Sequence, residues 1–261
     1  MLRALRTAAS GMTAQQLHID LVAHNLANVN TTGFKKSRAE FEDLLYQTLR
    51  PAGPGEGETQ VPTALQLGHG SRLVATAKIF SQGDTQVTGN PLDIAIEGDG
   101  FFQITLADGT IGYTREGSFR VDGDGRLVSS SGLPVEPEMT VPDDAEALLI
   151  NADGRIYART AGTETPTELG QILLARFVNP SGLEAIGGNL LRLGPSSGDP
   201  TVGAPGDLGM GSVRQGALER SNVDAVEEMV NMIVAQRAFE INSKSVRTAE
   251  DILAMVADLK R

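Results

Sequence analysis

Apolar residues recur every seven positions at both ends of the chain, and this repeat constrains the fold more than any other feature. Near the N-terminus, two sets of residues three positions apart occupy the a and d positions of a heptad. The sets are Leu2, Ala9, Gln16 and Ala23, and Leu5, Met12, Ile19 and Leu26. Because so narrow a stripe gives a lone helix little stability, the N-terminal helix needs a partner.

The partner is predicted at the other end of the chain, as one helix over residues 223–259. Its apolar residues fall into two stripes, which are Met232, Phe239, Val246 and Leu253, and Val223, Val226, Val230 and Ile233. Two stripes on one helix indicate more than one neighbouring helix. Ser221 with Asp224 predicts a capping box at the helix start. The alternative interpretation is ordinary packing of two helices inside one globular domain.

The sequence between the helices is rich in β signals. Apolar and polar residues alternate at 92–97 and again at 102–106. Asp-Gly pairs, which supply the positive φ angles of tight hairpins, begin at Asp108, Asp122, Asp124 and Asp153. Short strands at roughly ten-residue spacing indicate a small antiparallel sandwich or barrel.

The predicted fold class is therefore α+β, with long N- and C-terminal helices pairing as a coiled-coil-like region and an antiparallel β-rich domain inserted between them. The many Pro and Gly residues at 51–70 predict a loop or linker. We expect an N-terminal helix with its signature, an extended or linker segment, the β-rich domain and a C-terminal helix. The expected boundaries are 1–35, 36–70, 71–210 and 211–261.

Composition and charge exclude several functional classes. The 261-residue chain has no cysteine, so a disulfide framework, a cysteine nucleophile and a thiolate metal site are excluded. Its net charge of −11 opposes nucleic-acid binding, which needs clustered Lys and Arg. Arg3 and Arg6 resemble the start of a signal peptide, but Gln15, Gln16 and His18 interrupt any apolar region after them. No cleavable signal is predicted, and composition alone indicates a cytoplasmic protein.

No catalytic or metal-binding motif stands out in the sequence. His18 and His24 are six positions apart, whereas two ligands on one helical face need a spacing of four. Asp122 and Asp124 fail the EF-hand spacing, with Arg126 where a further ligand is needed. We therefore assign no catalytic, cofactor-binding or metal-binding residue. The alternative from another functional class is a secreted β-domain hydrolase of cell-wall glycan, because the plentiful Asp and Glu could supply a carboxylate pair.

Several motifs closely resemble those of bacterial flagellar rod and hook proteins. They are NLANVNTTGFK at 25–35, GDGFF at 98–102, YTREGSF at 113–119, SNVD at 221–224, VNMI at 230–233 and QRAFEIN at 236–242. The signature residues are Asn25, Leu26, Asn28, Thr32, Gly33 and Phe34. His24 departs from the family pattern, which usually has Asn there. The resemblance covers nearly the whole chain.

Within this family, FEDLLYQ at 41–47 and EINSK at 240–244 resemble the distal-rod members, and proximal-rod members are the alternative. The resemblance implies a structural subunit that polymerises helically into a hollow drive shaft, transmits torque to the hook and encloses the export channel. It implies no cofactor. The implied partners are other copies of the chain, proximal rod proteins, the hook protein, the ring proteins of the peptidoglycan and outer membrane, and the flagellar type III export apparatus.

The resemblance also implies a location and a set of contact residues. The rod of the basal body spans the periplasm, and export through the flagellar apparatus needs no cleaved signal, which reverses the cytoplasmic inference. We expect polymerisation and helix-packing contacts at Leu5, Met12, Ile19, Leu26, Val226, Val230, Ile233, Met232, Phe239, Val246 and Leu253. The segment with Pro51, Pro54 and Pro62 resembles a distal-rod extension, and we expect it to lie between neighbouring subunits and keep the shaft straight.

Overall fold

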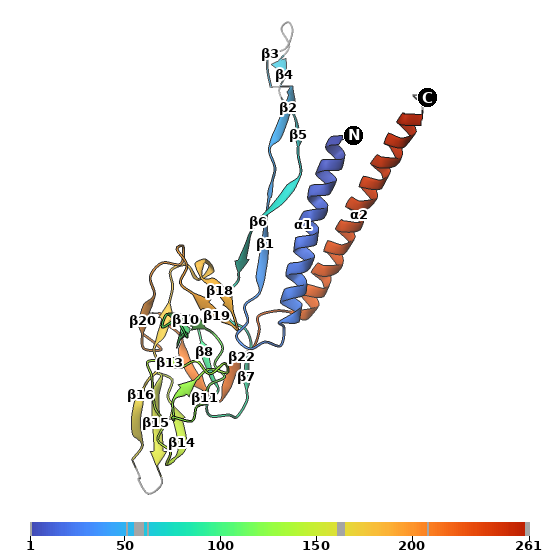
Figure 1. Ribbon diagram of the computed structural model, residues 1–261. Helices are drawn as coiled ribbons and strands as arrows, with labels where there is room; N and C mark the ends of the chain where they lie inside the picture. The colour runs from blue at the N-terminus through green and yellow to red at the C-terminus, as the bar shows by residue number, and fades with distance from the viewer. Residues whose placement is uncertain are drawn as a thin grey trace. The chain divides into compact units, whose positions relative to one another are not determined.

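The chain forms two long helices and many short antiparallel strands, which confirms the predicted α+β class (Figure 1). The computed structural model describes residues 2–50, 52–54, 60–61, 63–160, 165–207 and 209–258. The chain divides into two compact units. The helical unit comprises Met1–Ala27, Ser37–Ala77 and Asp224–Arg261, and the β unit comprises Asn28–Lys36 and Lys78–Val223.

The helical unit contains α1 (Leu2–Ala27) and α2 (Ala225–Asp258), which pack along each other (Figure 1). The buried face of α2 repeats in heptads, with Glu228, Ala235 and Ala249 buried and Met232, Phe239, Val246 and Leu253 half-buried. Gly11 allows a close approach, because a Cβ atom there would lie 3.0 Å from Asn242 Nδ2 of α2. In the part of the chain that the structure describes, neither helix is long and apolar enough to cross a membrane.

On α1, one of the two predicted sets of stripe residues is wrong. The half-buried set is Leu5, Met12, Ile19 and Leu26. The other set is exposed at Ala9, Gln16 and Ala23, and the buried residues are instead Ala14, Val22 and Asn25. The reason is a second neighbour, since α1 also contacts β1 (Ser37–Asp43). The His18 ring of α1 lies edge-on to Phe41 of β1, with the ring centroids 5.8 Å apart.

The start of α2 also differs from the prediction. Asp224 Oδ1 accepts hydrogen bonds from the backbone N–H groups of Val226 at 2.8 Å and Glu227 at 3.1 Å. Asp224 is therefore the N-cap, and it satisfies two of the free donors of the first turn by itself. The predicted capping box is wrong, because the Ser221 hydroxyl accepts the N–H of Val223 instead.

The helical unit also carries a two-stranded arm (Figure 1). Its pairs are β1 with β6 (Ser71–Lys78), β2 (Tyr46–Arg50) with β5 (Leu65–Gly68), and β3 (Gly53–Pro54) with β4 (Gln60–Val61). Within the predicted loop at 51–70, the prediction is thus wrong for Gly53–Pro54, Gln60–Val61 and Leu65–Gly68, because backbone hydrogen bonds between strands need no apolar pattern. The side chains of β2 and β5 are all exposed. Pro54 ends β3, whereas Pro51 and Pro62 lie outside the described residues.

The β unit is built on one seven-stranded sheet, in which β13 (Val135–Glu136) pairs with β9 off the main path. The order along that path is β18 (Glu184–Gly187), β19 (Leu190–Arg192), β10 (Ile111–Thr114), β9 (Phe101–Thr105), β17 (Leu174–Arg176) and β20 (Thr201–Gly203). The smaller sheets are β14 (Ala145–Ile150) with β15 (Arg155–Thr160) and β16 (Thr167–Gln171), β8 (Ile94–Glu97) with β21 (Ser212–Gln215), β7 (Thr85–Val87) with β22 (Ala217–Glu219), and β11 (Arg120–Val121) with β12 (Leu127–Val128). A short 3-10 turn, η1, spans Pro180–Gly182.

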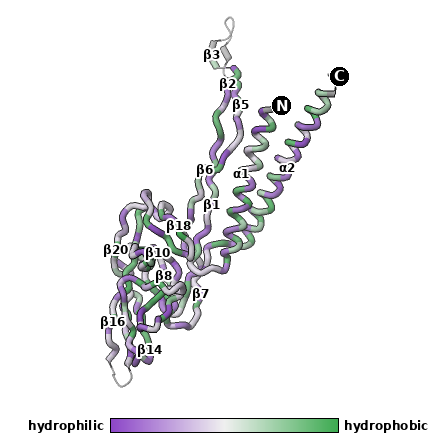
Figure 2. The backbone as a smooth tube through the Cα atoms, viewed as in Figure 1, coloured by the Kyte–Doolittle hydropathy of each residue, from purple (hydrophilic) through white to green (hydrophobic). Residues whose placement is uncertain are grey.

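The core of the β unit covers both faces of its central strand, β9. Phe102 packs edge-on against Phe119 on one face, with ring centroids 5.0 Å apart. Phe101 packs against Phe177 on the other face, at 5.8 Å. Figure 2 shows hydrophobic residues along strands of this unit as well as along both helices. Phe101 to Ile104 are all buried, so β9 is covered from both sides although apolar and polar residues alternate along it.

We predict that Gly33→Ala destabilises the β unit. Gly33 has a φ of 67°, and a Cβ atom there would lie 2.6 Å from the backbone nitrogen of Glu116. Left-handed strain costs roughly 1–3 kcal/mol in the free energy of unfolding, and the backbone clash adds to it. The matched control is Gly123→Ala, since nothing lies within 4 Å of a Cβ atom there. Urea unfolding followed by tyrosine fluorescence measures both, and equal midpoints would contradict the prediction.

Candidate functional site: an exposed helix face and a buried ion cluster

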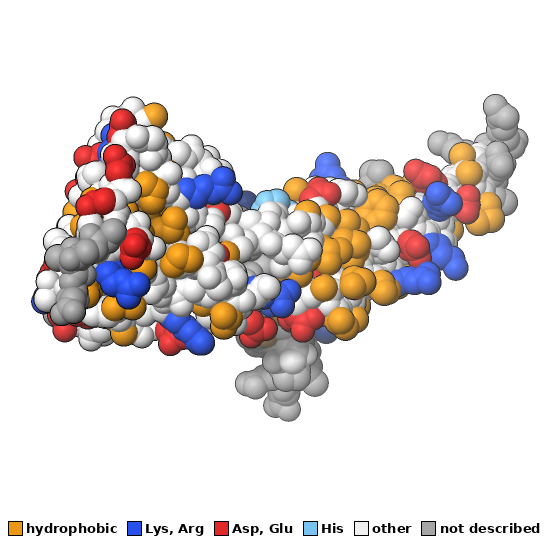
Figure 3. Space-filling view, turned by 90° about the horizontal axis from the view of Figure 1, so that it is seen from below, with side chains coloured by type: hydrophobic (Ala, Val, Ile, Leu, Met, Phe, Trp, Pro, Cys, Tyr) orange, Lys and Arg blue, Asp and Glu red, His pale blue; other side chains and the backbone are white. Residues whose placement is uncertain are grey.

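An apolar face of α2 is left uncovered in the single chain. We define the apolar face as Val226, Met229, Val230, Ile233, Val234 and Ile241. Spacings of three, four and seven place these residues on one side of the helix. Val226 is 69% exposed, and Ile233 is 57% exposed. Figure 3 shows hydrophobic side chains gathered over the helices in this way. Soluble proteins seldom expose so continuous an apolar patch unless it contacts another surface.

The two predicted stripes of the C-terminal helix have different surroundings. The stripe with Met232, Phe239 and Leu253 lies half-buried on the face of α2 that packs along α1. The stripe with Val226, Val230 and Ile233 belongs to the apolar face, and the fourth predicted member, Val223, is buried in the β unit. One stripe thus packs along α1, and the other is exposed in the part of the chain that the structure describes.

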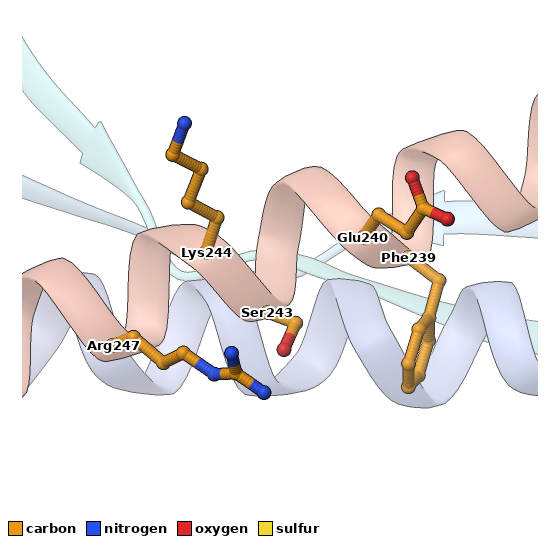
Figure 4. Close-up of a pocket in the computed structure, with 5 residues that line it drawn as sticks. All are labelled: Phe239, Glu240, Ser243, Lys244 and Arg247. Carbon is orange, nitrogen blue, oxygen red and sulfur yellow. The ribbon is translucent and has the colours of Figure 1, made fainter.

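A groove of about 420 Å³ runs along the second half of α2 and is lined by Phe239, Glu240, Ser243, Lys244 and Arg247 (Figure 4). In this view the side chains of Phe239 and Arg247 point towards α1, while Lys244 points away from it. Glu240 supplies the one carboxylate among the described residues that line the groove, and it accepts a hydrogen bond from Arg237 at 2.8 Å. Glycoside hydrolysis needs two carboxyl groups across the scissile bond, so this groove lacks the required pair.

The β unit contains a buried ion cluster, which we define as Lys35, Arg115 and Glu219. Their side chains are 4%, 3% and 0% exposed. Lys35 Nζ lies 2.5 Å from Glu219 Oε1, and it also donates to the carbonyl oxygen of Ser81 at 2.7 Å. Arg115 Nη1 lies 3.5 Å from Glu219 Oε2, while Nη2 donates to the carbonyl oxygen of Gly98 at 2.7 Å.

Burial dominates the electrostatics of this cluster. It lowers the pKa of Lys35 and the pKa of Arg115, and the negative charge of Glu219 opposes both changes. Asp99 adds to the opposing effect at Arg115. The Arg115 guanidinium also lies 5.5 Å from the centre of the Phe101 ring, which favours a cation. Glu219 is therefore one anion shared by two buried cations.

The ion cluster brings together motifs that lie far apart in the sequence. Lys35 ends the 25–35 motif, Gly98 begins GDGFF, and Arg115 lies within YTREGSF. Glu219 lies two residues before SNVD, and its carbonyl oxygen accepts the N–H of Gly33 at 2.8 Å. Sequence analysis missed Arg115 and Glu219 as buried partners. The pattern that could have indicated burial of Glu219 is its spacing in a strand, because Glu219 lies two residues after Ala217 and so on the same, buried face.

The remaining signature residues lie before Lys35 in the sequence, in the last turn of α1 and in the connection that follows it. Asn25 accepts the N–H of Ser37 at 3.0 Å and donates to the Ser37 carbonyl at 2.9 Å, which joins the last turn of α1 to the start of β1. Its amide also reaches Glu228 of α2 at 3.4 Å. Leu26 is half-buried, and the Asn28 side chain accepts a hydrogen bond from the Thr31 hydroxyl. The Thr32 carbonyl oxygen accepts a hydrogen bond from Asn189 Nδ2. Phe34 is buried, and Lys78 Nζ lies 5.3 Å from the centre of its ring.

Three family models match this chain, and together they define its class. The flagella basal body rod protein model matches residues 5–35, the flagellar hook protein FlgE/F/G D1 domain model matches residues 95–158, and the flagellar basal body rod FlgEFG protein C-terminal model matches residues 214–259. The chain is thus of the flagellar rod and hook class. All three matching families are families of structural proteins.

Individual relatives narrow this class further. The flagellar basal-body rod protein FlgG of Borreliella burgdorferi is 52% identical, and the alignment covers 100% of both chains. FlgG of Buchnera aphidicola subsp. Schizaphis graminum is 46% identical over 99% of this chain and 100% of its own. The hook protein FlgE of Helicobacter mustelae is 46% identical, but over 52% of this chain and 30% of its own. The chain belongs to the FlgG family of flagellar basal-body rod proteins.

We predict that Glu219→Gln destabilises the β unit more than Lys35→Met. Glu219→Gln leaves two buried cations without their anion, at a cost of about 3–5 kcal/mol, whereas Lys35→Met leaves one cation facing one anion. The control is Glu184→Gln, which removes a half-exposed pair with Arg192 and costs at most about 1 kcal/mol. Urea midpoints rank the three variants, and a reversed order of the first two would contradict the shared-anion account.

Proposed function

We propose that the chain is a structural subunit of the flagellar distal rod and that many copies polymerise helically into a hollow drive shaft. The shaft transmits torque to the hook and encloses the export channel. The observation that carries this proposal is the apolar face of α2, with Val226, Val230 and Ile233 each more than half exposed. The full-length match to basal-body rod proteins supports it.

In this proposal α1 and α2 pair in a coiled-coil-like way, and the helices of neighbouring copies cover the apolar face. Fully burying one Val or Ile side chain contributes about 1.5–3 kcal/mol, so a face of six apolar residues can hold copies together. The half-buried residues Leu5, Met12, Ile19 and Leu26 of α1 would contact α2 of the same chain and also the helices of the next copy. The acidic composition, with net charge −11, suits a chain that must stay dissolved before it assembles.

The family match supports a place in the basal body of the flagellum. We propose that the partners are further copies of the chain, the proximal rod proteins on one side and the hook protein on the other. Ring proteins of the peptidoglycan and outer membrane would surround the shaft. The export apparatus would deliver the chain to the periplasm without a cleaved signal peptide.

Two alternatives carry less support. A proximal rod subunit shares the family, but the arm from β1 to β6 contains the FEDLLYQ segment, which resembles distal members. A glycan hydrolase is not favoured, because the matching families are rod and hook proteins and the described lining of the groove on α2 includes a single carboxylate.

We predict that Val230→Asp prevents polymerisation while leaving the β unit folded. A carboxylate on the apolar face would be buried without a partner between copies, which raises the concentration needed for assembly by more than about tenfold. The matched control is Val178→Asp, because Val178 is 91% exposed in the β unit. Sedimentation and electron microscopy of both variants measure the polymer. Normal polymers from Val230→Asp would contradict the proposed contact.

We propose that the arm keeps the shaft straight by lying between neighbouring copies. Its exposed apolar side chains support this, since Leu45 is 89% exposed and Leu65 is 51% exposed. Thr48 pairs with Gln66, so replacing residues 49–65 by Asn-Gly closes the arm there with a two-residue hairpin turn. We expect curved polymers from the shortened chain in electron micrographs. Straight polymers indistinguishable from those of the full chain would refute the role of the arm.

A further inference from the structure

The chain passes between the β unit and the helical unit at four peptide bonds, which follow Ala27, Lys36, Ala77 and Val223. Beside three of these bonds, within the β unit, lie the segments 33–36, 78–83 and 219–222. The question is what holds these three segments where the chain enters and leaves the unit.

Asn222 connects the three segments through one side chain. Its Oδ1 accepts the backbone N–H of Lys36 at 2.7 Å, and its Nδ2 donates to the carbonyl oxygen of Ile79 at 2.8 Å. The N–H of Ile79 in turn donates to the carbonyl oxygen of Lys36 at 2.8 Å. Nδ2 also lies 3.2 Å from the carbonyl oxygen of Ser81. A single amide group therefore closes a ring of hydrogen bonds around the three exits.

The ion cluster connects the same three segments a second time. Lys35 reaches Ser81 and Glu219, which lie on the two other segments. Glu219 Oε1 also accepts the N–H of Gly83 at 2.9 Å. This second connection is buried, so it is shielded from water and weakened little by salt.

We propose that Asn222 and the ion cluster form an exit clamp that holds these three segments in fixed register, so that torque entering the β unit along one segment is shared by all three. This inference rests on the proposed function. A single peptide link can swivel about its φ and ψ angles, since only the peptide bond itself is rigid. Three cross-connected segments cannot swivel independently. The clamp is a positioning device, and Asn222 is its central residue.

The first test uses the purified full-length chain and needs no polymer. In Asn222→Ala, amide hydrogen exchange should accelerate about tenfold at Lys36, Ile79 and Gly83 together, because opening one connection loosens the others. The control is Ile104→Val, which removes one carbon atom from the core of the β unit, away from the exits, and lowers the stability of the unit mildly. At equal loss of stability, the control should leave these three amides slow.

Faster exchange at Lys36 alone, whose N–H loses its acceptor directly, would overturn the clamp. Equal acceleration in Ile104→Val would also overturn the clamp, because exchange at these amides would then follow the overall stability of the β unit. Asn222→Asp keeps the acceptor for Lys36 and removes the donor to Ile79, so it should accelerate Ile79 and Gly83 while Lys36 changes least.

The second test measures torque in cells that assemble flagella from each variant. Cells with Asn222→Ala should build rods of normal length but stall at a lower viscous load than cells with Ile104→Val. Equal stall loads with normal rods would overturn the clamp. If the unaltered chain forms no rods, the proposed function fails, and the exchange experiment still decides whether the three segments are clamped.

Discussion

The contact between Lys35 and Glu219 is the interaction on which the arrangement of the β unit depends. A buried carboxylate without a partner costs several kcal/mol, so the chain segments that carry Glu219, Lys35 and Arg115 must meet for the unit to fold. Gly33 helps to join these segments, because its left-handed backbone allows its N–H to donate a hydrogen bond to the Glu219 carbonyl oxygen. Motifs from three parts of the sequence are thus joined by one anion.

The two units satisfy their apolar residues in different ways. The β unit has its own core, with Phe102 and Phe119 on one side of β9 and Phe101 with Phe177 on the other. The helical unit buries one stripe of α2 against α1 and leaves the apolar face uncovered. A chain with one self-sufficient unit and one incomplete unit suits a subunit that folds first and assembles afterwards, because the proposed contacts between copies would complete the helical unit.

Sequence reasoning succeeded where the pattern depends on one neighbour. The C-terminal helix was predicted within two residues at its start, and the stripe through Met232 and Phe239 lies on the face of α2 that packs along α1. It failed on α1 because β1 adds a second neighbour that a heptad count omits. It failed in the arm because strand pairing there involves backbone groups and exposed side chains. It missed Glu219 and Arg115 because charged residues are usually exposed, and their burial depends on segments far apart in the sequence.

Electron microscopy of the purified chain at rising concentration, seeded with isolated basal bodies, tests the central claim most directly. The comparison is a chain of residues 28–223, which keeps the β unit and the arm but lacks both helices. Our account predicts straight tubes from the full chain and soluble monomers from the shortened one. Tubes from the shortened chain, or a full chain that stays monomeric on the seeds, would contradict the claim that the helices build the shaft.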